Sequence, residues 1–144
     1  LVAFPIGVLS GIVATLGMDV VMERVSEGKT APRVASGVLT ETHPDESPER
    51  LSGFVHYFAG AGSGALYAYI LLAVSYAEVG TAARLAIGAF VLYVGMVGFF
   101  VAVPLRISSM EEERVSEVAR GWALSALAYV AVIAPTFGVV SSVV

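Results

Sequence analysis

Residues 51–77 read LSGFVHYFAGAGSGALYAYILLAVSYA and contain no Asp, Glu, Lys or Arg. Three further stretches share this property, at residues 1–18, 85–105 and 121–144. About 20 helical residues, each rising about 1.5 Å, cross the hydrocarbon core of a bilayer, and uncharged runs of roughly 18 residues or more are typical of such helices. The four runs therefore predict an all-α polytopic membrane protein, folded as one four-transmembrane-helix bundle over residues 1–144.

The composition supports the same class. Apolar residues make up 57% of the chain and charged residues 14%, whereas soluble domains are usually about 45–50% apolar and about a quarter charged. The chain has no cysteine, which excludes disulfides, thiolate catalysis and cysteine-type zinc sites. A net charge of -4 disfavours a nucleic-acid partner. The basic residues are nearly all Arg and the loops are rich in Glu, a bias typical of halophilic proteins.

The spans are expected at about residues 2–22, 51–76, 82–103 and 121–143. Ser47 is the expected N-cap of the second span, with Pro48 at its first helical position. The third span should stop at Pro104. Ser108 and Ser109 each precede a glutamate by three residues, which is the spacing of a capping box and predicts a polar helix leading into the fourth span.

The connection over residues 23–50 is too long to be a simple turn. Pro32 could start a short helix that places Val34, Val38 and Leu39 on one side, which would suit a segment lying on the membrane surface. An irregular, solvated loop is the alternative interpretation, and the sequence does not decide between the two.

The basic residues predict the orientation of the bundle. One is in the short turn between the second and third spans, Arg84, and the other seven are in connections 23–50 and 104–120: Arg24, Lys29, Arg33, Arg50, Arg106, Arg114 and Arg120. Because cytoplasmic loops carry the excess of Lys and Arg, both long connections are expected in the cytoplasm and both termini outside the cell membrane.

Two pairs of glycines have the spacing of helix-packing motifs. Gly7 and Gly11 are four residues apart in the first span, and Gly60 and Gly64 are four apart in the second. Small residues at this spacing allow two helix backbones to approach closely in lipid. Gly11 and Gly64 are about equally deep from the cytoplasmic ends, so we expect the first two spans to pack through these glycines. A contact between two copies of the chain is the alternative.

If these helices pack together, Asp19 and His56 share a depth and can face each other. Ionisable groups in a span are costly unless they are paired or hydrated. One hypothesis is a pair that handles protons or ions, since histidine titrates near neutral pH. A second is a hydrogen bond that only joins the helices. A third adds Glu23, one turn beyond Asp19, to form a divalent-metal site with His56.

Other chemistry finds little support in the sequence. Haem with two axial histidines is not expected, because the only histidine besides His56 is His43, in a polar loop. The chain has no arrangement of nucleophile and base, no phosphate loop and no hydrolase motif. We therefore expect neither a cofactor nor an enzymatic activity.

The sequence also resembles a known family. The run GIVATLGMD at residues 11–19 is followed by a long loop and then by His56, Gly60, Gly64 and Tyr67. This pattern is similar to the YagU-like group of small four-helix membrane proteins and covers about the first half of the chain. The resemblance implies a multi-span inner-membrane protein in which Asp19 and these four residues are the matching positions. It implies no particular activity.

Two functional hypotheses follow. The first is a non-catalytic subunit or interaction module of a membrane complex, with the lipid bilayer and either other membrane subunits or further copies of the chain as partners. The alternative is a small homo-oligomeric transporter or proton-linked channel, in which Asp19 and His56 form the coupling pair and Arg106 lies at the cytoplasmic mouth.

Overall fold

The computed structural model describes residues 2–144 and is all-α, as expected. Its five helices are α1 (Ala3–Met22), α2 (Thr30–Thr40), α3 (Glu49–Val74), α4 (Thr81–Phe100) and α5 (Glu112–Val143). Helices α1, α3, α4 and α5 are each long and apolar enough to cross a membrane. Their positions match the four uncharged runs of the sequence.

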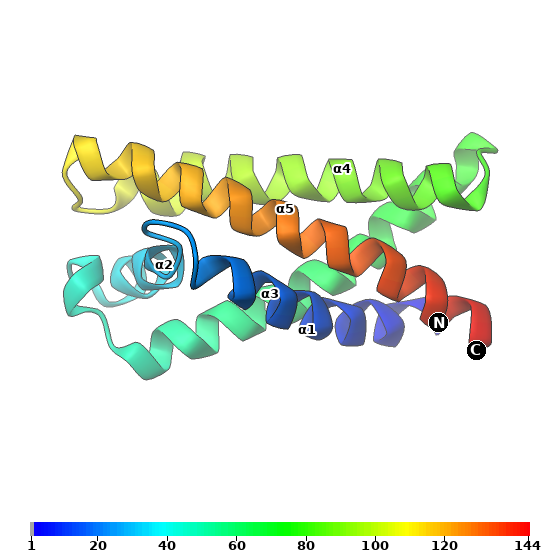
Figure 1. Ribbon diagram of the computed structural model, residues 1–144, viewed down its shortest axis with the longest axis horizontal. Coiled ribbons are helices and arrows are strands. Elements are labelled where there is room, and N and C mark those ends of the chain that lie inside the picture. The colour runs from blue at the N-terminus through cyan, green and yellow to red at the C-terminus, as the bar shows by residue number, and fades with distance from the viewer. Residues whose placement is uncertain (1) are drawn as a thin grey trace.

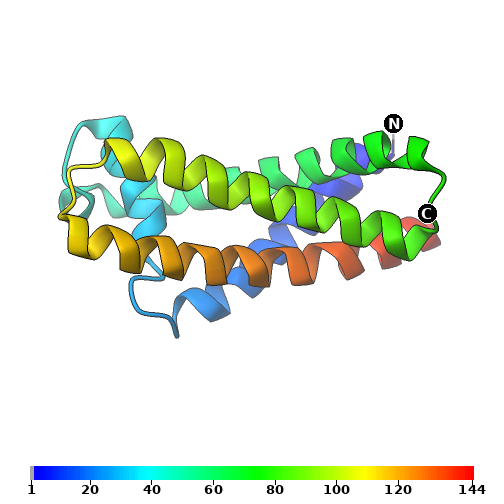
Figure 2. The same ribbon diagram turned by 90° about the horizontal axis from the view of Figure 1, so that it is seen from above.

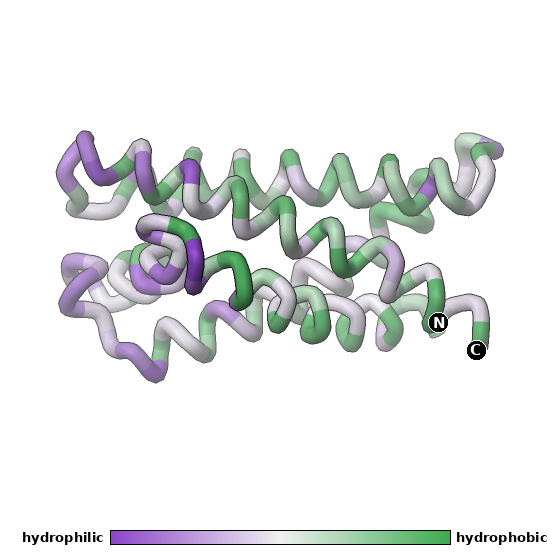
Figure 3. Tube along the Cα trace, viewed as in Figure 1, coloured by the Kyte–Doolittle hydropathy of each residue, from purple (hydrophilic) through white to green (hydrophobic). Residues whose placement is uncertain are grey.

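The four long helices lie roughly along one direction and form an elongated bundle (Figures 1 and 2). The chain termini lie at one end, called here the termini end, and α2 lies at the other, called the α2 end. Helix α1 packs against both α3 and α5, while α4 packs against α5 and, less extensively, α3. Hydrophilic residues gather at the α2 end, and the long helices are mostly apolar (Figure 3).

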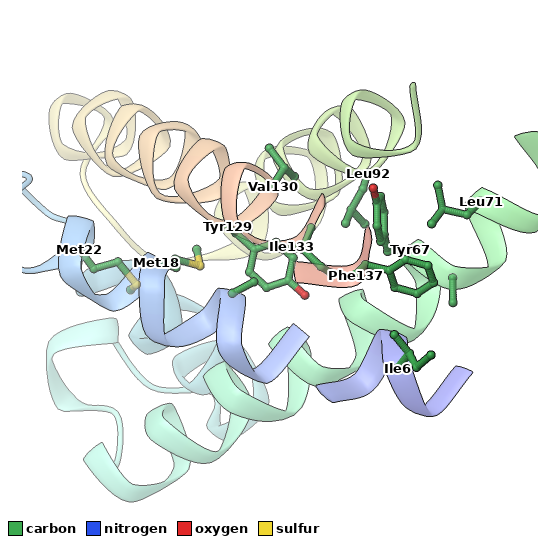
Figure 4. Close-up of a cluster of buried hydrophobic side chains, with 12 residues drawn as sticks. Ile6, Met18, Met22, Tyr67, Leu71, Leu92, Tyr129, Val130, Ile133 and Phe137 are labelled. Carbon is green, nitrogen blue, oxygen red and sulfur yellow. The ribbon is translucent and has the colours of Figure 1, made fainter. Parts of the chain in front are cut away.

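The main hydrophobic core lies between α1, α3, α4 and α5 (Figure 4). Tyr67, Tyr129 and Ile133 are fully buried there, and Leu92 is 1% exposed. The tyrosine hydroxyls do not lack partners in this apolar setting: Tyr67 donates to the carbonyl of Leu85 at 2.8 Å. Such bonds offset the cost of burying a polar group.

Helix α2 confirms one of the two interpretations of residues 23–50, but its position corrects the expected detail. Val34 is fully buried in a second small core with Phe100, Leu105 and Val118, so this side of α2 packs against protein. Leu39, expected on the same side, is 67% exposed. Helix α2 therefore packs its apolar side against α3, α5 and the segment that follows α4, rather than presenting that side to a membrane.

The expected helix caps are wrong. Helix α3 begins after Pro48, and the hydroxyl of Ser47 donates instead to the carbonyl of Pro44. Helix α5 begins at Glu112 with Glu111 at the capping position and no side-chain cap. Ser108 donates to the carbonyl of Leu105. Each of these two serines thus closes the turn that precedes it, a local bond that competes with capping of the next helix.

Pro104 does not stop the third long helix. Residues Val101–Leu105 form a π-helical turn that contains Pro104, and helical structure continues through Ile107. A proline in a helix lacks the N–H that the regular hydrogen-bond ladder requires. The wider turn accommodates this missing donor, and Leu105, which follows the proline, is buried against α2 and α5.

Candidate functional site

The polar pair of the sequence is formed in the structure. Asp19 lies in the last turn of α1 and His56 lies two turns into α3. Nε2 of His56 is 2.6 Å from Oδ1 of Asp19. The His56 side chain is 10% exposed and that of Asp19 is 33% exposed. The contact therefore lies at the border between the buried interior of the bundle and its surface at the α2 end.

Tyr57 completes this polar group. Its hydroxyl donates to Oδ2 of Asp19 at 2.6 Å. Each oxygen of the Asp19 carboxylate thus has one partner from α3. Sequence reasoning did not single out Tyr57, although its position directly after His56 was the available signal.

The glycines explain why these two helices meet. A Cβ at Gly11 would lie 2.6 Å from the carbonyl oxygen of Gly60 and 2.9 Å from Cα of Gly64. A Cβ at Gly7 would collide with the Gly64 carbonyl. The structure thus brings all four glycines into one contact between α1 and α3, where only glycine allows this backbone distance.

A third helix joins at the same place. The hydroxyl of Tyr129 on α5 donates to the carbonyl of Gly60 at 2.6 Å, and the hydroxyl of Thr15 on α1 lies against Gly60. Since Gly60 lies one turn beyond His56, this junction fixes α3 relative to α1 just beside the polar pair. Sequence reasoning found no role for Tyr129, because nothing in the spacing of the tyrosines indicated its target.

The three-residue metal site is not formed. Glu23 lies one turn beyond Asp19, but its nearest charged partner is Lys29, at 3.6 Å. Within residues 2–144, no group of three His, Asp, Glu or Cys side chains is positioned to hold a metal ion. The roles of Asp19 and His56 in proton or ion handling stay predictions.

A cavity of about 420 Å³ opens beside the pair, between α3 and α4. Its lining is almost entirely apolar or aromatic. Helices α3 and α4 converge at the turn that connects them and separate towards the α2 end (Figure 1), so the cavity occupies the space between their separated halves. Side chains of α1 and α5 form its floor, and α2 closes one end: Thr15, Met18, Trp122, Tyr129, Ala31, Pro32 and Ala35.

His56 lines two spaces of different character. It borders the apolar cavity and also a polar cleft of about 270 Å³ at the α2 end. The cleft carries charges of both signs on Asp19, Glu23, Glu49, Lys29 and Arg33. The hydrogen-bonded imidazole is therefore the polar group through which the two spaces adjoin.

A second charged group holds the α2 end together. Arg114 at the start of α5 bonds both oxygens of Glu27, in the loop after α1, at 2.9 and 3.1 Å, and both oxygens of Asp45 at 2.8 and 2.9 Å. These bonds lower the pKa of Glu27 and of Asp45 below their ordinary values, with the Arg114 hydrogen bonds as the main cause. The cluster ties α5 to the two segments that flank α2.

Comparison of the chain with family models, with curated proteins and with solved structures found no match.

Proposed function

We propose that the chain is a multi-pass protein of the cell membrane and a non-catalytic interaction module. Helices α1, α3, α4 and α5 would span the bilayer, with α2 and both long connections in the cytoplasm and both termini outside. The gathering of hydrophilic residues at the α2 end supports this arrangement (Figure 3). So does the basic excess in residues 23–50 and 104–120. We also propose that the chain is related to the YagU-like group, on the basis of the similarity of residues 11–67.

The observation that carries the interaction role is the poor coverage of α4. Only 17% of its most apolar stretch is buried, against 39% for that of α1. The uncovered side of α4 and of the π-helical turn that continues it includes Val94, Gly98 and Val101. A Cβ at Gly98 would meet no atom within 4 Å. A glycine inside a helix costs about 1 kcal/mol relative to alanine. A neighbouring helix packed on Gly98 would offset this cost, since small residues are enriched at helix contacts in membranes.

Purification from native membranes in a gentle detergent, followed by mass spectrometry, tests the interaction role. A stoichiometric partner, either another membrane protein or a second copy, is expected with the wild-type chain. Gly98→Leu should abolish its copurification, because the larger side chain fills the contact. Ala86→Leu is the matched control, since Ala86 is exposed on the same helix and lies outside the named surface. Partner loss in both variants, or in neither, would contradict the assignment of the α4 surface.

The Asp19–His56 bond favours a second candidate, a small homo-oligomeric proton-linked transporter. Its support is that the pair adjoins both the cavity and the polar cleft. Against it stands the termini half of the bundle, which Tyr67, Ile133 and Phe137 fill. Proton flux into liposomes, lost in Asp19→Asn with the helical content unchanged, would favour transport over the interaction role. Equal flux in wild type, Asp19→Asn and empty liposomes would rule transport out.

A further inference from the structure

The cavity between α3 and α4 has the size of a small-ligand site. Its volume is about 420 Å³, and pockets for small molecules are about 300–1,000 Å³. A transmembrane helix, at about 10–12 Å in diameter with side chains, is too thick to enter it. The occupant that this space fits is therefore a small molecule rather than a helix of a partner.

The half of the cavity nearer the termini end suits a hydrocarbon chain. Leu66 and Leu92 line it, and glycines stand on both walls, Gly62 on α3 and Gly95 on α4. A Cβ at either glycine would meet nothing within 4 Å. These glycines therefore widen the space between the helices, in contrast to Gly60 and Gly64, which close a helix contact.

The half nearer the α2 end has a different character. His56 lies there together with Phe99, Phe100 and Trp122. The rings of Phe100 and Trp122 pack with centroids 4.9 Å apart, and the indole N–H of Trp122 already donates to the carbonyl of Met96. His56, held through Nε2 by Asp19, places an imidazole on this part of the lining. A flat ring finds aromatic surfaces here, and an oxygen on it finds an imidazole.

We infer that this cavity binds a membrane amphiphile of the quinone class, with one hydrocarbon tail and a flat, oxygen-bearing ring as its head. The tail lies between α3 and α4 towards Leu66, and the ring lies beside His56 and Trp122. Asp19 is a positioning residue that orients the imidazole. The inference rests on the proposed insertion in a bilayer, because a sideways opening between two spans admits ligands from the hydrocarbon.

The charges nearby disfavour a phospholipid head. The adjoining cleft carries the carboxylates of Asp19, Glu23 and Glu49 beside the cations Lys29 and Arg33. A phosphate would meet no excess of positive charge there. An uncharged head needs none: Nδ1 of His56, the ring nitrogen that Asp19 does not hold, accepts from a hydroxyl when the imidazole is neutral and donates to a carbonyl oxygen when the imidazole is protonated.

Trp122 provides the test, because it is the only tryptophan of the chain and lines the cavity. Decylubiquinone, a quinone with a ten-carbon tail, is titrated into the full chain in lipid nanodiscs while tryptophan fluorescence is recorded. Saturable quenching is expected with the wild-type chain. Gly95→Leu and Gly62→Leu should each lose the saturable part, because their side chains fill the cavity. Ala86→Leu, matched in size but outside the cavity, should retain it.

Two further variants examine the head of the ligand. His56→Phe keeps a ring but removes the hydrogen bond, and should weaken binding by about tenfold. Asp19→Asn should weaken it less, and adding it to His56→Phe should weaken binding no further, which a merely structural role in α1–α3 packing would not predict. Recovery of the fluorescence by 1-decanol at concentrations similar to that of decylubiquinone would overturn the assignment of a ring.

The outcomes separate this inference from the function on which it depends. A chain that does not enter nanodiscs or float with vesicles would contradict membrane insertion. A chain that inserts and keeps its helical content, but shows only linear, unsaturable quenching, would overturn the ligand and leave the interaction role standing. Equal saturable quenching in Gly95→Leu and wild type would place the quinone outside the cavity.

Discussion

Gly62 and Gly64 lie two residues apart on α3 and have opposite surroundings. A Cβ at Gly64 would collide with the carbonyl oxygen of Gly7 and lie 2.7 Å from Cα of Gly11, both of which belong to the α1 backbone. Backbone atoms cannot yield as the end of a flexible side chain can. A Cβ at Gly62 would enter open space. The same substitution at these two positions therefore separates close packing from helix propensity.

We expect Gly64→Ala to destabilise the bundle by about 1–3 kcal/mol, the usual cost of overpacking a well-packed contact. Gly62→Ala is the matched control and should be neutral or stabilising by up to about 1 kcal/mol, since alanine favours helix more than glycine does. Thermal unfolding in detergent, followed by circular dichroism, measures both. Equal stability of the two variants would contradict the close α1–α3 contact.

The contact between Asp19 and His56 could be predicted from the sequence because it depends only on how deep each residue lies along its helix. The equal depth of Gly11 and Gly64 placed Asp19 opposite His56, and the structure has these side chains in contact. Tyr57 and Tyr129 were missed because their bonds depend on the rotation of each helix about its axis. Hydropathy does not reveal that rotation in a chain whose long helices are apolar nearly all round.

Among the elements, α2 differs most from what its sequence suggests. Its buried side is formed by Ala31 and Val34, whereas Leu39 faces outward. Its end also lacks a glycine signal, because Glu41 adopts the left-handed conformation there, with φ of 57°. The existence of the helix could be predicted from Pro32, but its rotation depends on Leu105 and Val118, which are far away in the sequence.

Val34→Ala should destabilise the α2 end by about 1.5–3 kcal/mol, because two buried methyl groups are lost and a void remains. Leu39→Ala, on the exposed side of the same helix, should change stability little. Limited proteolysis should cut residues 23–48 faster in Val34→Ala than in wild type. A faster cut in Leu39→Ala would instead favour the membrane-surface interpretation.

The Arg114 cluster should make the α2 end sensitive to acid. The folded-state pKa of Glu27 lies below its ordinary value of 4.5, so its bond to Arg114 stabilises the fold above about pH 4.5 and this contribution is lost as the pH falls through the folded-state pKa. Arg114→Gln should therefore lower stability at pH 7, by about 1 kcal/mol, and this difference should shrink as the pH falls below 4.5.

Melting temperatures of wild type and Arg114→Gln across this pH range measure the effect. Arg106→Gln is the control, since Arg106 is exposed near the same end of the bundle. A constant difference between wild type and Arg114→Gln from pH 7 to pH 3 would show that the carboxylates do not take part.

For the whole molecule, the four uncharged runs sufficed to predict the helices, because each long helix coincides with one run. They did not predict how the helices are arranged. Helices α1, α3 and α5 meet at Gly60. Helix α4, in contrast, packs mainly against α5 and less extensively against α3. This uneven assembly, which leaves the cavity at Gly62 and Gly95, depends on side-chain fit between segments distant in the sequence.

The proposed orientation can be tested with single cysteines, since the chain contains none. Glu46→Cys, at an exposed position beside α2, should react with a membrane-impermeant maleimide only after intact cells are permeabilised. Val79→Cys, in the turn between α3 and α4 and 39% exposed in the wild type, should react from outside. Labelling in the reverse pattern would contradict the inference from the basic residues.

Helices α3 and α4 are close together at the turn that connects them and diverge towards the α2 end (Figure 1). The Tyr67–Leu85 hydrogen bond joins the two helices near that turn. Phe99 lies at the other end of α4, where the helices are farthest apart. A small rotation of α4 about the turn produces its largest displacement at the far end of the helix. The distance between α3 and α4 at Phe99 therefore responds most strongly to any tilt of α4. Bilayer thickness, which influences the tilt of a spanning helix, would thereby regulate the separation of α3 and α4 beside the cavity.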